Sequence, residues 1–192
     1  MPVFRTVKDA RQGTVRLEAI HQPLYDSVLI TQSASVTFFQ NPSGRSYLNT
    51  NLTTAGQLSW PKRFSVRALR QVMALGATLF NDQVQFLARA AYKVQVGEKV
   101  YLQIPAFLLT AGTGLEAQQL LGTTVPTVPA ITSTVANHGR PEQRNIYSLL
   151  HSIYIPPVQN FLVILDIAAG FTAAVSFNLW IFLEGELLRE IQ

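Results

Sequence analysis

The longest apolar run of the chain lies near its C-terminus and limits the possible folds more than any other feature. Residues 160–183 read NFLVILDIAAGFTAAVSFNLWIFL and are almost uninterruptedly apolar. A membrane-spanning helix needs about 20 such residues, so the run is long enough to cross a bilayer. It is also long enough for two buried strands joined at the AAG segment. The choice between these two structures decides what class of protein this is.

The spacing of the apolar residues favours two strands. After Gly170 every second residue from Val175 to Leu183 is apolar, while the intervening positions are mixed and include Ser176 and Asn178 as well as Trp180 and Phe182. Successive side chains of a strand point to opposite faces, whereas a lipid-facing helix has no reason to keep this parity. A helix would also hold Asp166 inside the bilayer, at a cost of roughly 2.5–3.5 kcal/mol. We therefore predict two long strands, with Asp166 buried; a membrane anchor through residues 160–183 remains the alternative.

Strand patterns also dominate the rest of the chain. The clearest segments are SVTFFQ (35–40), RFSVRAL (63–69), YKVQV (92–96) and VYLQI (100–104). Gly97-Glu98 joins the last two segments and predicts a β-hairpin. The patterns add up to about seven to nine strands with no long helix, which indicates an all-β sandwich or barrel.

Residues 110–144 differ from this pattern because they are rich in Thr, Gly, Pro and Ala. We predict a long ordered loop excursion between strands, with room for a short helix at residues 115–121. Loops of this length inside a compact domain usually serve a function or an interface. Both a contact between subunits and a ligand-binding loop fit the composition.

Composition and motifs argue against an enzyme. Charged residues make up 14% of the chain, below the usual share of about 25%, and a weakly charged surface favours self-association. Without cysteine there is no disulfide or thiolate metal site. His21, His138 and His151 do not have the spacing of metal ligands, and no hydrolase or nucleotide-binding motif occurs. We expect no catalytic residue, metal or cofactor. The acidic residues near the C-terminus are expected to be exposed and solvating: Glu184, Glu186 and Glu190.

Basic residues are concentrated in the first third of the chain. Residues 1–72 carry nine Lys and Arg against three Asp and Glu, a net charge of +6. Four of the basic residues lie in a predicted N-terminal arm at residues 1–30: Arg5, Lys8, Arg11 and Arg16. Such an arm can contact the phosphates of nucleic acid or of lipid headgroups. A solvated, frayed terminus is the alternative.

A second basic segment, SWPKRFSVRALR (59–70), interleaves arginines with aromatic residues. On a regular strand Arg63 and Arg67 share one face, and Arg70 falls on the opposite face. Three interpretations remain: a sheet that binds oligonucleotides, a solvated strand face, and a subunit interface, for which arginine suits better than lysine. We select four residues as candidates for a subunit interface: Trp60, Arg63, Arg67 and Arg70.

Two blocks of the sequence resemble a known family. In TNLTTAGQLSWPKRFSVRALR (50–70), an Asn/Thr-rich loop and an Ala-Gly turn precede Trp-Pro-Lys-Arg and a strand. SFNLWIFLEGELLREIQ (176–192) is a long last strand that closes on L-x-G-x-x-x-R. Together they resemble the small single jelly-roll capsid proteins of tailless icosahedral bacteriophages, especially those with an internal membrane. The resemblance in architecture covers residues 33–192.

The resemblance implies a single eight-stranded jelly-roll sandwich at residues 31–192, interrupted by the loop excursion. It implies a structural capsid subunit, located in the virion, that assembles with other copies of itself into an icosahedral shell without an active site or a cofactor. A second capsid protein is a further partner that it allows, and the N-terminal arm would face the viral genome or an internal membrane. The alternative is a carbohydrate- or ligand-binding β-sandwich module, which would line one groove with Trp60, Trp180 and tyrosines.

Overall fold

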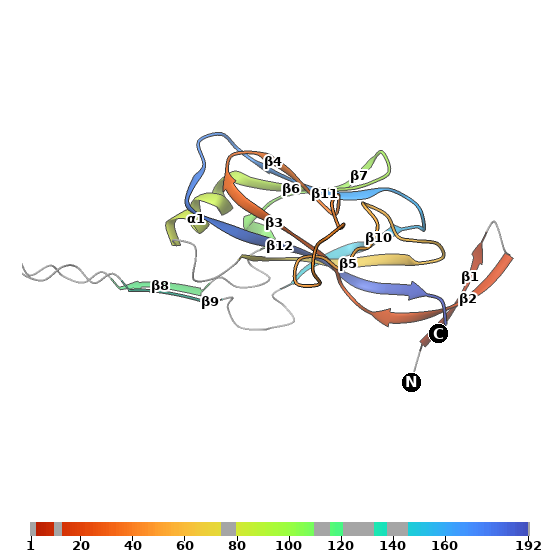
Figure 1. The fold of residues 1–192 in the computed structure, drawn as a ribbon. Helices are drawn as coiled ribbons and strands as arrows, with labels where there is room; N and C mark the ends of the chain where they lie inside the picture. Colours follow the sequence, from red (N-terminus) through yellow and green to blue (C-terminus); the bar gives the residue numbers. More distant parts are fainter. Residues whose placement is uncertain are drawn as a thin grey trace, which may run out of the picture.

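The computed structural model of the chain describes residues 3–9, 13–73, 80–109, 116–120, 133–137 and 146–191. These residues form an all-β fold in which two antiparallel sheets lie face to face (Figure 1). The all-β class predicted from the sequence is therefore confirmed.

The larger sheet has six strands, and the last strand of the chain lies at its centre. Its members are β1 (Val3–Asp9), β2 (Gly13–His21), β3 (Leu24–Gln32), β5 (Arg63–Met73), β10 (Tyr147–Ile155) and β12 (Thr172–Arg189). The order is β1-β2-β12-β5-β10, and β3 also pairs with β12. Because β12 has 18 residues, one of its edges holds first β3 and then β2, while the other edge holds β5.

The smaller sheet has four strands in the order β4-β11-β6-β7. Its members are β4 (Ser35–Phe38), β6 (Ala90–Val96), β7 (Lys99–Pro105) and β11 (Phe161–Ile167). Strands β6 and β7 form the predicted hairpin. Its turn contains Gly97 with a φ of 60°, a left-handed conformation that glycine adopts without a steric cost.

Two further elements accompany the sheets. Helix α1 (Phe80–Arg89), which the sequence patterns did not predict, packs Phe86 edge-on against Phe177, with ring centroids 5.7 Å apart. Strands β8 (Glu116–Leu120) and β9 (Ser133–Asn137) pair as a hairpin, so the short helix for which the sequence left room at residues 115–121 does not form over β8. The other residues of the predicted loop excursion lie outside the described residues.

The apolar C-terminal run forms the two predicted strands, β11 and most of β12. Phe177, Leu179 and Ile181 are at most 1% exposed, as the parity predicted. Within the described part of the chain, no helix has the length and apolar character needed to cross a membrane. The prediction that Asp166 is buried is wrong: alternation along β11 turns it outward, where its carboxylate accepts a hydrogen bond of 2.6 Å from the Ser35 hydroxyl.

A pair of linked side-chain hydrogen bonds crosses the apolar core between the sheets. The hydroxyl of Tyr92 on β6 donates to Oε1 of Gln71 on β5 at 2.7 Å, and Nε2 of Gln71 donates to the carbonyl oxygen of Ala106 at 3.0 Å. Burial raises the pKa of the Tyr92 hydroxyl well above its usual range, so this group stays protonated and remains a donor. The chain of hydrogen bonds fixes the position of β6 relative to β5.

Most of the predicted N-terminal arm is extended chain that belongs to the larger sheet. Strands β1 and β2 form a hairpin that projects from one end of the sandwich (Figure 1). Strand β3 crosses the boundary predicted at residue 30 and buries Leu24 and Ile30 in the core. Residues on both sides of that boundary therefore contribute to the core.

Candidate functional site: an arginine–glutamate cluster on the larger sheet

A bulge in β5 brings its three arginines onto the outer face of the larger sheet. The register against β12 passes from Ala68 to Val66, so that Arg67 is an extra residue. The extra residue reverses the alternation and turns Arg70 to the same face as Arg63. The prediction that Arg70 lies on the opposite face is therefore wrong, because strict alternation holds only where a strand has no bulge.

Gly185 makes this bulge possible from the β12 side. A Cβ atom at this position would lie 1.9 Å from the carbonyl oxygen of Ser65, a distance that no side chain tolerates. Only glycine allows the two backbones to come this close. In the sequence, Gly185 within LEGEL (183–187) indicates a bulge or turn near the end of the last strand, but the segment does not indicate which of the two paired strands holds the extra residue.

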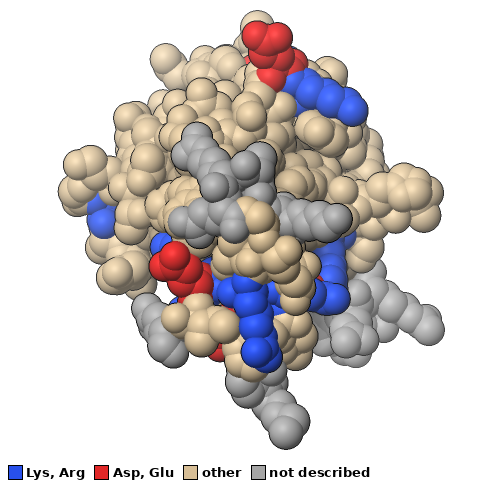
Figure 2. All heavy atoms as spheres, turned by 90° about the vertical axis from the view of Figure 1, so that its right-hand side faces the viewer, with Lys and Arg blue, Asp and Glu red and all other residues tan. Residues whose placement is uncertain are grey.

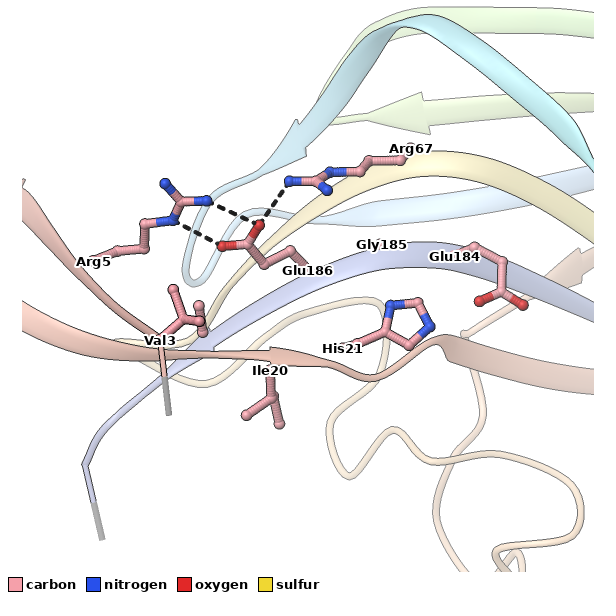
Figure 3. A pocket seen from close by; sticks show the side chains of 9 residues that line it. Val3, Arg5, Ile20, His21, Arg67, Glu184, Gly185 and Glu186 are labelled. Carbon is pink, nitrogen blue, oxygen red and sulfur yellow. Dashed lines mark hydrogen bonds and ion pairs between the residues drawn. The ribbon is translucent and has the colours of Figure 1, made fainter. Parts of the chain in front are cut away.

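Glu186 of β12 binds two arginines from different strands (Figure 3). Nε and Nη2 of Arg5 lie 3.0 and 3.4 Å from its two carboxylate oxygens. Nη2 of Arg67 lies 2.7 Å from Oε2 of the same carboxylate. The expectation that Glu186 only solvates the C-terminal end is wrong, since its side chain is 19% exposed and joins the N-terminal hairpin to β5.

A cavity of about 350 Å³ lies beside this cluster. Figure 3 shows Arg5 and Arg67 reaching Glu186 from either side, with His21 and Glu184 further along β2 and β12. Figure 2 looks at the end of the molecule that carries the hairpin, where basic and acidic side chains lie close together below the centre of a largely uncharged face. On this face, several charged side chains thus gather in one place, and a second small group lies at the upper edge of the view.

The remaining members of the cluster are less exposed. Nη2 of Arg70 lies 2.8 Å from Oε1 of Glu184, and its guanidinium carbon lies 4.7 Å from the ring centroid of Phe182. The buried Nε of Arg70 has no hydrogen-bond partner among the described residues. Arg63 is only 6% exposed and therefore offers little surface to a neighbouring molecule.

The other candidates from the sequence lie apart from this cluster. Arg16 on β2 stacks over the ring of Phe4, 4.4 Å from its centroid. Lys8 lies on β1 opposite Thr14, and Arg11 is outside the described residues. Trp60 is half-buried, and no described residue accepts a hydrogen bond from its buried Nε1. Of the predicted arm residues whose side chains the structure describes, Arg5 and Arg16, only Arg5 lies together with the predicted interface arginines.

An aromatic pocket lies further along the same outer face. It has a cavity volume of about 480 Å³, and its lining residues are Tyr25, Tyr47, Leu48, Val72, Met73, Trp180 and Phe182. The sequence held one signal for this pocket, because Trp180 and Phe182 have the same parity on β12 as Glu184 and Glu186. Tyr47 and Leu48 could not be assigned to the pocket from the sequence, because their position depends on how the connection between β4 and β5 folds.

That connection is held to the edge of β3 by a buried ion pair. Nη1 of Arg45 lies 2.6 Å from Oδ1 of Asp26, which is 2% exposed. The backbone N–H groups of Ser27 and Phe39 also donate to the Asp26 carboxylate, at 2.9 and 2.5 Å. Burial nevertheless raises the pKa of Asp26 above its usual value, because the loss of hydration outweighs these bonds. Thr50 completes the contact through an isolated bridge to Asp26.

The groups gathered at this face are suited to binding. No three His, Asp or Glu side chains in the described part of the chain come together as metal ligands. Asp26 and Tyr92 have shifted pKa values, but both serve structural hydrogen bonds. His21 borders the cavity, His151 is exposed on β10, and His138 lies outside the described residues. The chemistry available at this face is recognition by guanidinium groups and aromatic rings.

A scan of the sequence against protein-family models and a search of curated proteins both found no match.

Proposed function

We propose that the chain is a structural subunit of a viral capsid, built as an eight-stranded jelly roll that assembles with copies of itself. The order in which the strands are wound supports this proposal. One sheet contains β3-β12-β5-β10 and the other β4-β11-β6-β7. Strands that follow one another in the sequence, such as β3 and β4 or β11 and β12, therefore lie in different sheets. Jelly rolls of eight strands in two sheets occur in capsid proteins, lectins and cupins.

The observation that carries the proposal is the amount of apolar surface at separate places on the molecule. Tyr47 and Leu48 are 81% and 82% exposed beside the aromatic pocket, and Leu150 on β10 is 93% exposed. Contiguous exposed apolar groups on a protein surface mark interaction sites. Several such surfaces on one chain fit a subunit with several neighbours, which a shell requires.

The N-terminal hairpin gives further support. It projects beyond the sandwich, and within the described residues β1 pairs only with β2 (Figure 1). A projecting strand with a free edge can contact an adjacent subunit, a second capsid protein, the genome or an internal membrane. In this proposal the protein resides in the virion, and burial of apolar area between subunits stabilises the shell.

Electron microscopy and sedimentation velocity of the purified chain at several salt concentrations test the proposal. We expect ordered shells or discrete large oligomers that dissociate when apolar contacts are weakened by chaotropic salt. A chain that remains monomeric at every salt concentration, alone and after mixing with proteins of a candidate virion, would contradict it.

A carbohydrate-binding module is the second candidate, and the aromatic pocket favours it. Trp180 and the tyrosines Tyr25 and Tyr47 line one cavity, as sugar recognition requires, although Trp60 is not among them. The polar groups of the rings are already engaged, however: Nε1 of Trp180 donates to the Leu48 carbonyl at 2.8 Å, and the Tyr25 hydroxyl donates to the Tyr47 carbonyl. A glycan array that shows no binding rejects this candidate.

A further inference from the structure

A second cavity lies on the other side of the Glu186 cluster and has a different composition. Its volume is about 190 Å³, and it is bounded by β1, β5, β10 and β12. Three arginines, Arg5, Arg63 and Arg67, line it together with a single acid, Glu186, and the phenol of Tyr154. Because this pocket is formed within one chain, its binding properties do not depend on the proposed assembly.

The charge of the exposed lining residues suits an anion. The two exposed guanidinium groups, those of Arg5 and Arg67, outnumber the single carboxylate of Glu186, so the part of the pocket that a ligand can reach has an excess of positive charge. A phosphate group would offset this excess. A cavity of this size lies below the range of about 300–1,000 Å³ that is usual for drug-sized ligands, so it suits a small group.

The two exposed arginines have N–H groups to spare. Arg5 donates two N–H groups to Glu186 and Arg67 donates one, out of five on each guanidinium. Their side chains are 54% and 62% exposed, so the other donors can reach a ligand. Planar guanidinium groups bind phosphate oxygens in pairs, which lysine cannot do.

Glu186 competes with an external anion for the guanidinium groups of Arg5 and Arg67. Its carboxylate holds both arginines where no external anion is present, as Figure 3 shows from the neighbouring cavity. An incoming phosphate would have to displace or share these bonds. The affinity of the pocket for phosphate is therefore limited by this carboxylate.

We propose that the pocket lined by Arg5, Arg63 and Arg67 is a phosphate-binding site whose affinity is set by competition from Glu186. The phosphate can be free, part of a nucleic acid or part of a lipid headgroup, and all three present the same oxygens to the arginines.

Isothermal titration of the full chain with inorganic phosphate, against sodium chloride at equal ionic strength, tests the site. Arg67→Gln should weaken phosphate binding by about tenfold or more, since one charged hydrogen bond is worth at least that factor. Glu186→Gln should instead strengthen binding, because it removes the competing carboxylate. Arg16→Gln is the matched control, because it removes an arginine of the same hairpin that does not line the pocket and should leave binding unchanged.

The opposite signs of these effects separate a binding site from a structural cluster. If the arginines only hold the hairpin, Glu186→Gln would bind phosphate no more tightly than the wild type, and the proposal is overturned. Binding of phosphate no tighter than chloride, or equal losses in Arg67→Gln and Arg16→Gln, also overturns it. Circular dichroism and melting curves of every variant confirm that the fold is retained.

The source of the phosphate is identified with two further ligands. Oligodeoxythymidylate and phosphatidylglycerol vesicles, the latter compared with phosphatidylcholine vesicles, are each titrated against the wild type and the same variants. If one of these ligands binds most tightly to Glu186→Gln, less tightly to the wild type and least tightly to Arg67→Gln, the site is supported and that ligand is identified as the source of the phosphate. Binding of inorganic phosphate alone in that order supports the site with free phosphate as its ligand.

Discussion

At Gly185, the backbones of β12 and β5 lie so close that a Cβ atom would overlap the carbonyl oxygen of Ser65. At this close approach β5 has its bulge, Arg67 points outward and the arginines converge. A single residue without a side chain thus determines which face of the sheet carries the charge of β5.

Gly185→Ala should therefore destabilise the protein by about 3 kcal/mol or more, since the neighbouring atoms belong to backbone that cannot rotate away. Denaturant unfolding followed by circular dichroism measures the change. Ser176→Ala, at an exposed position of the same strand, is the control and should change the stability little. Equal midpoints for both variants would contradict the close approach of the two backbones.

Asp26 gives a prediction about pH. Its pKa is raised in the folded state above its ordinary value of 3.8, mainly by desolvation. The folded protein then binds more protons than the unfolded chain between that value and the folded pKa, so the free energy of unfolding falls as pH rises through this window. In Asp26→Asn this contribution is absent. Urea unfolding at several pH values from about 3.5 upward should show that the stability of the wild type relative to Asp26→Asn decreases with pH. A difference independent of pH would refute the assignment.

At the scale of elements, the connection between β4 and β5 protects the edge of β3. Asn51 contributes most directly: its N–H donates to the Tyr25 carbonyl at 3.3 Å, and its Oδ1 accepts from the Tyr25 N–H at 2.9 Å. An exposed edge strand would otherwise offer these groups to another chain. The Arg45–Asp26 ion pair anchors the protecting segment.

Arg45→Met should loosen this segment without unfolding the sheets. The change leaves the buried Asp26 carboxylate without its cationic partner, at a cost of about 2–3 kcal/mol. Hydrogen exchange should accelerate at Tyr25 and Asn51 but not in the centre of β12. Arg89→Met is the control, because Arg89 makes an exposed hydrogen bond of 3.0 Å to the Ala169 carbonyl. Unchanged exchange at Tyr25 would show that the ion pair does not anchor the segment.

The strands with period-two patterns were predictable because burial of one face selects that pattern directly. The β6–β7 hairpin and the inward residues of β12 are the clearest cases. Helix α1 was missed because its apolar contacts depend on Phe171 and Phe177, which lie far along the chain. The sequence left room for a short helix where β8 lies for a related reason, since β8 is defined by its pairing with β9.

At the scale of the whole molecule, charge is sparse and apolar groups are exposed at several places. Strand β10 pairs only with β5 among the described strands, and a register shift near Ser148 turns Leu150 fully outward. In a shell this edge would lie against a neighbouring subunit.

Leu150→Glu should reduce assembly while leaving the isolated fold intact. A charge at an exposed site changes stability by less than about 0.5 kcal/mol, but it is costly once buried in an interface. Sedimentation velocity should show a shift toward smaller species, with an unchanged melting temperature. Gln32→Glu, exposed at the end of β3, is the control. Equal assembly of both variants would exclude this edge from the interface.

The amino-acid sequence by itself determined the all-β class, the two C-terminal strands and the concentration of basic residues in the first third, because these depend on local alternation and composition. Only the tertiary structure decided that Arg5, Arg63 and Arg67 converge around Glu186. Their convergence depends on a one-residue bulge and on strand pairings between residues more than 100 positions apart. Neither leaves a periodic signal in the sequence, since a bulge reverses alternation and long-range pairing is selected by packing of the complete core.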